Sequence, residues 1–193
     1  MSIRMTTHSS NELRERGQTA RNEIPEELHS KYSLRICYRF LNSGLFFRAK
    51  NIACYLASRS EVDTSLIFER AWRAKKRIYV PIIEKHGQMR FVQIKRNTRL
   101  ERNHFGIWEP VSGTDISSTE LDVVVTPLVA FDEKLNRIGM GGGYFDRYFS
   151  FLKSNQQWLK PKLVGFAFEC QKIEKIAPNH WDIPLYRVLT ERN

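Results

Sequence analysis

Apolar residues recur at helical spacing in the first quarter of the chain. Ser9 and Glu12 stand three residues apart, which is the spacing of a capping box, and they predict a helix over 9–22. We expect a second helix after Pro25, because proline suits the first turn of a helix. Its apolar face is a stripe with a four-residue period: Leu28, Tyr32, Ile36 and Phe40.

Short apolar runs farther along the chain predict strands. The run at 121–127 (LDVVVTP) is apolar on both faces, which is typical of a central strand in a parallel sheet. The run at 78–81 (IYVP) is expected to stop at Pro81. Further strands are predicted at 51–57, 163–168 and 187–190.

Helices and irregular chain separate these strands. A third helix can be capped by Asp63 or Thr64, and it ends in the basic run 73–77, which suits the negative end of a helix dipole. A fourth helix is predicted over 144–153. Residues 97–120 contain proline, glycine and several hydroxyl residues, and they indicate a long surface connection.

The order of the predicted elements defines the fold class. Gly87 separates IIEKH from MRFVQI, which indicates an antiparallel hairpin at the edge of the sheet. Strands that alternate with helices elsewhere predict a three-layer α/β/α sandwich around a largely parallel sheet. The chain shows no internal repeat and no linker, so we expect residues 1–193 to form a single domain.

Composition narrows the class of protein. Hydrophobic residues make up 41% of the chain, with 12 Phe and 4 Trp, which is enough to fill a core. The three cysteines are too scattered for a disulfide framework or a zinc ribbon, and we expect Cys54 and Cys170 to be core residues. No apolar run reaches the length of a membrane span, and the first residues lack the apolar region of a signal peptide. We therefore expect a cytoplasmic protein without a membrane partner.

The net charge of +10 lies entirely in the first part of the chain. Residues 1–110 hold 21 basic and 11 acidic residues, whereas residues 111–193 hold ten of each. Such a field attracts nucleotides, phosphates, polycarboxylates or nucleic acid, although a solvated basic surface has the same composition. The chain has no strand with interleaved aromatic residues of the kind that binds RNA, so we expect no nucleic-acid partner.

The most informative segment is 137–148, RIGMGGGYFDRY, which holds four of the ten glycines within five residues. Glycine backbone can turn its N–H groups toward one point, and a helix that starts behind it adds a positive dipole end. The segment therefore predicts a phosphate cradle, with Asp146 placed to hold Mg²⁺ and Tyr144 and Phe145 placed to line a ring-shaped substrate. It matches neither a P-loop nor a dinucleotide fingerprint. A plain strand-to-helix turn is the alternative.

In this segment the chain resembles the 5-formyltetrahydrofolate cyclo-ligase family, also called methenyltetrahydrofolate synthetase. The resemblance covers about residues 10–190. Besides TPLVAFDEKLNRIGMGGGYFDRY at 126–148, it is carried by SRSEVDT, RAKKRIYVP, FGIWEP and VGFAFECQKIEKIAPNHWDIPL, which begin at residues 58, 73, 105 and 164.

The resemblance implies a role for individual residues. ATP would be bound by Ser10, Arg14, Arg137, Gly139, Met140, Gly141, Gly142, Gly143, Tyr144 and Phe145. The folate would contact Leu56, Glu61, Met140, Gly141, Gly142, Gly143 and Tyr144. Asp146 and Asp182 would be ligands of Mg²⁺, and Arg137 and Tyr144 would act in catalysis.

The chain departs from the family pattern at two positions. Ser10 stands where the family usually has lysine, and Phe145 stands where it often has tyrosine. Taken without the family, three of the acidic residues have plainer interpretations. Glu61 fits a helix cap or a surface carboxylate, Asp146 an acid in the first turn of a helix, and Asp182 part of an ordered turn.

The implied activity is an ATP-driven ring closure. It converts 5-formyltetrahydrofolate, in some cases polyglutamylated, to 5,10-methenyltetrahydrofolate, ADP and phosphate through a phosphorylated formyl group, with Mg²⁺ as cofactor. Two other classes stay open on the residues alone: a sugar-phosphate isomerase or CoA-transferase-like enzyme, and a nonenzymatic RNA- or anion-binding protein. We expect a monomer that acts on small molecules.

Overall fold

A seven-stranded sheet forms the centre of the protein in a computed structural model that describes residues 9–58, 60–84, 87–103, 106–154 and 160–193. In spatial order the strands are β11 (Arg187–Leu189), β10 (Lys162–Phe166), β7 (Val123–Pro127), β1 (Asn51–Cys54), β2 (Arg77–Ile83), β3 (Met89–Ile94) and β6 (Asp115–Ile116). The first five of these neighbouring strands run parallel, as predicted. The sixth strand, β3, pairs antiparallel with both of its neighbours, β2 and β6.

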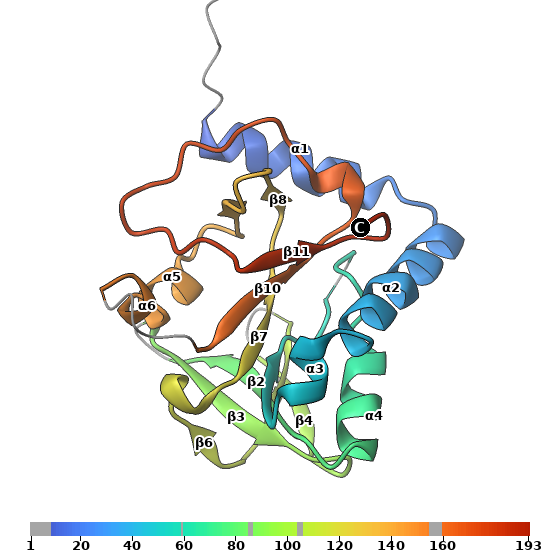
Figure 1. Ribbon diagram of the computed structural model, residues 1–193, viewed down its shortest axis with the longest axis vertical. Helices are drawn as coiled ribbons and strands as arrows, with labels where there is room; N and C mark the ends of the chain where they lie inside the picture. The colour runs from blue at the N-terminus through green and yellow to red at the C-terminus, as the bar shows by residue number, and fades with distance from the viewer. Residues whose placement is uncertain (1–8, 59, 85–86, 104–105, 155–159) are drawn as a thin grey trace, which may run out of the picture.

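Helices cover both faces of this sheet, which confirms the three-layer sandwich (Figure 1). One face carries α2 (Glu26–Leu41), α3 (Gly44–Arg48) and α4 (Ser65–Arg73), and the other carries α5 (Tyr144–Tyr148) and α6 (Phe151–Ser154). Successive residues of a strand point to opposite faces. Val123 and Val125 therefore pack in the cluster that contains Phe40 of α2, whereas Val124 packs in the cluster that contains Phe149.

Helix α1 (Ser10–Asn22) crosses the end of the sheet at which β7 finishes (Figure 1). The predicted Ser9–Glu12 capping box is present at its start. Leu13 packs against Ile138 and Ile176, and a β-carbon on Gly17 would lie 2.4 Å from the carbonyl oxygen of Val129. Because glycine alone permits this approach, α1 lies directly on the chain that follows β7.

Several predicted boundaries are wrong. β1 ends at Cys54 instead of continuing to residue 57, and β2 continues through Pro81 to Ile83. Proline is compatible with that position because Tyr79 is the last residue of β2 that pairs with β1, so β2 has a partner on one side only. The predicted helix over 144–153 is two short helices, α5 and α6.

Other predictions hold only in part. β2 and β3 form the predicted hairpin, but β6 pairs with β3 and takes the edge; residues 85–86 of the hairpin lie outside the described chain. The segment predicted as irregular contains β6, a hairpin of β4 (Leu100–Arg102) and β5 (Trp108–Pro110), and the 3-10 turn η2 (Ser118–Glu120). Cys54 is buried, whereas Cys170 is exposed in the 3-10 turn η3 (Glu169–Gln171). No helix in the described chain is long and apolar enough to cross a membrane.

Candidate active site

The glycine loop connects the short hairpin of β8 (Ala130–Phe131) and β9 (Arg137–Ile138) to α5. Gly141 has a φ of 104°, and Gly143 has a φ of 64° and is the N-cap of α5. A residue with a β-carbon is strained in this region of φ. Met140 and Gly141 are exposed, so this loop presents its backbone to solvent, as a cradle for an anion requires. Because α5 has only five residues, the loop backbone is the larger contribution and the helix dipole the smaller one.

Helix α1 packs its side chains onto the glycine loop. The Nε atom of Arg14 donates a hydrogen bond of 2.9 Å to the carbonyl oxygen of Gly139, and a β-carbon on Gly141 would lie 3.5 Å from the Arg14 guanidinium carbon. One helical turn later, Gln18 Nε2 lies 3.3 Å from Met140 Sδ. The structure thus brings Arg14 to the predicted ATP loop. Ser10 is exposed and lies one helical turn before Arg14 on the same face of α1.

Arg137 and Asp146 form an ion pair behind the loop. Arg137 Nη2 lies 2.8 Å from Asp146 Oδ1, and the side chains are 5% and 21% exposed. Arg137 Nη1 donates to the carbonyl oxygen of Ile183, whose own N–H donates to Asp146 Oδ1 over 3.0 Å. The guanidinium therefore ties β9, α5 and the chain around Ile183 together, and it is largely withdrawn from solvent. In this arrangement Arg137 positions Asp146.

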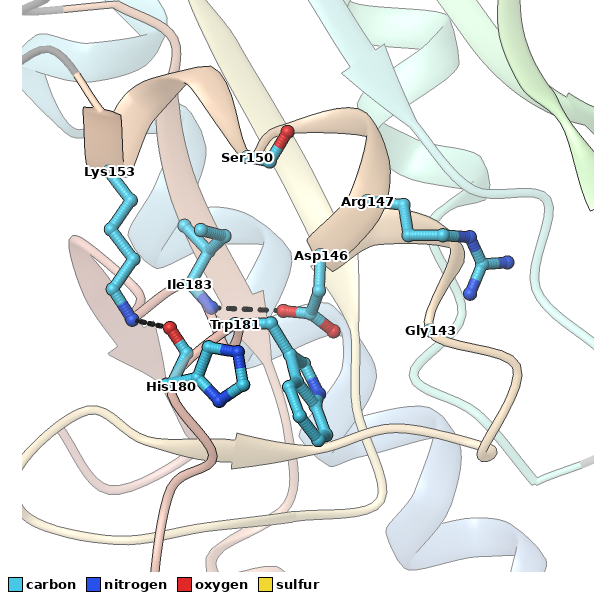
Figure 2. Close-up of a pocket in the computed structure, with 8 residues that line it drawn as sticks. All are labelled: Gly143, Asp146, Arg147, Ser150, Lys153, His180, Trp181 and Ile183. Atoms are coloured by element: carbon cyan, nitrogen blue, oxygen red, sulfur yellow. Dashed lines mark hydrogen bonds between the residues drawn. The ribbon is translucent and has the colours of Figure 1, made fainter.

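A cavity of about 440 Å³ lies next to this ion pair (Figure 2). Asp146 Oδ2 accepts no hydrogen bond within the part of the chain that the structure describes, and in Figure 2 the second carboxylate oxygen points away from Ile183. Two of the lining side chains, Arg147 and Lys153, are cationic. The cavity is lined by Gly143, Asp146, Arg147, Ser150, Lys153, His180, Trp181 and Ile183.

Asp182 does not line this cavity, although its two neighbours in sequence do. Its Oδ2 atom accepts hydrogen bonds from the backbone N–H of Asn179 (2.7 Å) and from Asn179 Nδ2 (3.3 Å). The carboxylate thus closes a turn. Among the described residues no three His, Cys, Asp or Glu side chains gather as a metal site. The acidic oxygens therefore fit Mg²⁺ only if a bound phosphate and water complete its coordination, which is how proteins usually hold this ion.

Glu61 lies in a loop that several elements hold. Its Oε2 atom accepts hydrogen bonds from the backbone N–H (3.0 Å) and the hydroxyl (3.3 Å) of Ser58. His29 of α2 places Nε2 3.0 Å from the carbonyl oxygen of Glu61 and 3.2 Å from that of Ser60. Arg21 of α1 donates from Nε to the Ser60 hydroxyl over 3.0 Å. These contacts fix the backbone that carries Glu61.

The chain before Glu61 is anchored in the core. Leu56 is half-buried and packs against the cluster under α2 and α4. Tyr55 is buried, and its hydroxyl donates to the carbonyl oxygen of Val62 over 3.0 Å. Burial raises the pKa of Tyr55, and the nearby charge of Glu61 raises it further. The Tyr55–Val62 hydrogen bond anchors the chain on both sides of Glu61.

Helix α1 is the element that links the two regions of the site. Arg14 contacts the glycine loop, and Arg21, seven residues later, contacts the loop of Glu61. Seven residues of helix span about 10 Å. The two positions of α1 that contact these motifs, which are far apart in sequence, are therefore about 10 Å apart along the helix.

The two aromatic residues after the glycines behave differently. Phe145 is half-buried and packs its ring against Phe91 (centroids 6.3 Å apart) and Phe149 (6.1 Å), at the border of the apolar cluster. Tyr144 is half-buried, with the Arg147 guanidinium 5.2 Å from its ring centroid.

Several residues around the glycine loop and the cavity were not predicted from the sequence. Gln18 follows Arg14 by one helical turn, and that spacing was a usable signal. The cavity is formed where α6 meets the segment before β11, and this brings together Lys153, His180 and Trp181. No local sequence pattern predicts that meeting.

The protein is an α/β sandwich with a glycine loop beside a cavity, and comparison with known proteins identifies its class. The family described as "5-formyltetrahydrofolate cyclo-ligase family" matches residues 6–191. The chain therefore belongs to the 5-formyltetrahydrofolate cyclo-ligase family, a family of enzymes. This membership favours the ligase over the isomerase, CoA-transferase and RNA-binding alternatives.

Individual relatives agree with the family assignment. A 5-formyltetrahydrofolate cyclo-ligase of Escherichia coli strain K12 is 40% identical over 174 residues, which cover 88% of this chain and 93% of the relative. One of Haemophilus influenzae is 38% identical over 149 residues, or 74% and 76% of the two chains. The NMR structure of Aquifex aeolicus 5,10-methenyltetrahydrofolate synthetase superposes with a TM-score of 0.82 at 28% identity, and covers 95% of this chain and 90% of that one.

Proposed function

We propose that the protein converts 5-formyltetrahydrofolate to 5,10-methenyltetrahydrofolate at the expense of ATP, with Mg²⁺ as cofactor. The observation that carries this proposal is the contact of Arg14 with the glycine loop next to the cavity that contains Asp146. This arrangement offers backbone N–H groups and a guanidinium to a polyphosphate, and a carboxylate to the Mg²⁺ that accompanies it.

The reaction consists of two displacements. The formyl group on N5 is an amide, whose nitrogen donates into the carbonyl and makes the carbon a poor electrophile. The formyl oxygen attacks the terminal phosphorus of ATP, the bond to the bridging oxygen breaks, and ADP leaves. N10 then attacks the activated carbon and loses its proton, and the C–O bond breaks to release phosphate. The protein supplies position and charge neutralisation in both steps.

Each group in the site has a task in this scheme. The loop at 139–143 cradles the phosphates, and Arg14 holds that loop and adds positive charge to it. Arg137 positions Asp146 through their ion pair. Bound Mg²⁺ would neutralise phosphate charge, and Asp146 and Asp182 are the residues proposed to hold it. Tyr144 lies over the loop, where its ring borders both substrates.

On the folate side, Glu61 recognises the pterin ring and Leu56 packs near it. The contacts from Ser58, His29 and Arg21 hold the Glu61 loop in place before the substrate arrives. A carboxylate can accept hydrogen bonds from neighbouring N–H donors of a pterin. Loss of one such pairing in a desolvated site costs about 1–3 kcal/mol, which corresponds to roughly tenfold or more in affinity.

The activity is tested by mixing the protein with 5-formyltetrahydrofolate and MgATP and following the absorbance band of methenyltetrahydrofolate. We expect the band to grow only when ATP and a divalent cation are both present. Controls omit ATP, or add EDTA in excess of Mg²⁺. Growth of the band without ATP, or none with all components, would exclude the proposed reaction.

The folate assignment is tested separately by titration of Glu61→Gln with each ligand. We expect folate affinity to fall tenfold or more while ATP affinity stays nearly unchanged. Glu69→Gln, on the exposed side of α4, is the matched control. If ATP affinity falls and folate affinity does not, Glu61 belongs to the nucleotide.

A further inference from the structure

The cavity beside α5 and α6 contains an aromatic side chain that packing does not explain. Trp181 is 56% exposed, although it is one of the largest apolar side chains in the protein. Its ring forms an edge contact with His180 at 4.6 Å between centroids. An indole left in water at the wall of a cavity provides a flat surface for a ligand ring.

The backbone that carries Trp181 is held on both sides. The carbonyl oxygen of His180 accepts a hydrogen bond from Lys153 Nζ. Ile183, two residues after Trp181, bonds to Asp146 through its N–H and to Arg137 through its carbonyl oxygen. The indole is therefore exposed on a fixed segment. A ligand that stacks on it binds without the entropy cost of ordering a loop.

Charge is arranged along the same cavity. Lys153 reaches from α6 to the carbonyl oxygen of His180, beside Trp181, whereas the Arg147 guanidinium lies 5.2 Å from the Tyr144 ring centroid and points away from Trp181 (Figure 2). The charge of Asp146 is paired with Arg137, whereas Arg147 and Lys153 line the cavity and form no ion pair within the described chain. A flat aromatic wall next to two cations matches a ligand with a planar ring at one end and phosphates at the other.

We propose that Trp181 is the platform on which the adenine ring of ATP stacks, with the phosphates running past Lys153 and Arg147 toward Gly143. The inference rests on the proposed function and adds the place and orientation of the nucleotide. The base lies on the segment before β11, and the terminal phosphate lies at the glycine loop.

The kinetic test compares Trp181→Ala and Trp181→Phe with Phe47→Ala, which removes an exposed ring from α3 on the other face of the sheet. Loss of a stacked base weakens binding by about tenfold. We expect the KM for ATP to rise about tenfold in Trp181→Ala and much less in Trp181→Phe, with the KM for 5-formyltetrahydrofolate unchanged. A rise in the folate KM alone would make Trp181 a pterin platform, and no change in either would make it a surface residue; both results overturn the proposal.

A second probe separates the base from the phosphates. Inorganic tripolyphosphate carries the charge of ATP without the ring, and we expect it to compete with ATP. Trp181→Ala should leave its inhibition constant unchanged, whereas Lys153→Gln should raise it. If Trp181→Ala weakens the binding of tripolyphosphate as much as the binding of ATP, the variant has disturbed the cavity and the stacking assignment fails.

A binding measurement keeps this inference distinct from the proposed reaction. ADP should quench part of the tryptophan fluorescence of the wild-type protein and much less of that of Trp181→Phe. Equal quenching in both proteins contradicts the stacking even where turnover is normal. If instead the protein binds ADP with quenching that depends on Trp181 and yet shows no turnover, that result supports the nucleotide site and contradicts only the proposed reaction.

Discussion

Arg14 and Gly139 are 125 residues apart in sequence, yet the Arg14 side chain donates a 2.9 Å hydrogen bond to the Gly139 carbonyl oxygen. The bond fixes the first residue of the glycine loop to the amino-terminal helix. It also places a guanidinium next to Gly141, where the loop backbone turns. The helix therefore contributes both the position and the charge of the candidate phosphate site.

Replacement of Arg14 tests this relationship. We expect Arg14→Gln to raise the KM for ATP by about tenfold or more, because the hydrogen bond to Gly139 and a positive charge beside the proposed phosphate site are both lost. Arg14→Lys should recover only part of this effect, since lysine cannot hold the carbonyl and a phosphate with one planar group. Arg16→Gln, exposed on the same helix, is the control. Equal KM values in Arg14→Gln and Arg16→Gln would refute the role.

The glycine loop offers a matched pair of substitutions. Gly141 has a φ of 104° and lies against Arg14, whereas a β-carbon on Gly139 meets no atom within 4 Å. Gly141→Ala should therefore lower the free energy of unfolding by about 1 kcal/mol or more and weaken ATP binding. Gly139→Ala should have little effect on stability. Calorimetric titration and thermal unfolding measure both quantities. ATP affinity at the wild-type value in Gly141→Ala would contradict the cradle.

Asp146 has two roles that can be separated. Asp146→Asn removes the proposed metal ligand and also leaves the nearly buried Arg137 without a counter-charge, so both Mg²⁺ dependence and stability should suffer. We expect a higher Mg²⁺ concentration for half-maximal activity and a loss of about 1–3 kcal/mol in the free energy of unfolding. Arg137→Gln should lose similar stability but keep the Mg²⁺ dependence closer to the wild-type value. Unchanged Mg²⁺ dependence in Asp146→Asn would remove Asp146 from the metal site.

The contacts of Asp122 lead to a prediction of how the stability of the protein depends on pH. Its carboxylate accepts hydrogen bonds from the backbone N–H groups of Lys50 (2.8 Å) and Asn51 (2.9 Å) and from Lys160 Nζ (2.5 Å). Burial alone would raise the pKa of Asp122, but the hydrogen bonds from Lys160, Asn51 and Lys50 outweigh it, and the pKa is lowered.

A lowered pKa in the folded state means that Asp122 stabilises the protein above its unfolded pKa of about 3.9, and that this contribution disappears as pH falls through the folded value. Asp122→Asn should therefore be less stable than the wild type by about 1–3 kcal/mol at pH 7. The difference should shrink as the pH falls below about 4. Urea unfolding at several pH values measures it. A difference that is independent of pH would show that packing, and not charge, is what Asp122 contributes.

The sequence by itself determined the elements whose signals are local. The Ser9–Glu12 capping box fixes the start of α1, because both partners lie within one helical turn. The run that forms β7 is apolar on both faces, and it is a central strand covered by helices. The alternation of such elements was sufficient for the three-layer sandwich, since few arrangements bury all of their apolar faces.

Only the tertiary structure decided what the side chains of the site contact. The resemblance implied that Arg137 binds ATP, and the fold shows which partners its guanidinium has: Asp146 and the carbonyl oxygen of Ile183, because β9, α5 and the segment before β11 meet there. The contact between the Phe145 and Phe91 rings also depends on the whole fold, because it joins α5 to β3. The sequence contains no signal for Trp181, whose exposure depends on where two distant segments close a cavity. A local pattern records the conformation of its own backbone, whereas a side chain bonds to whichever partner the packing of the whole chain brings nearest.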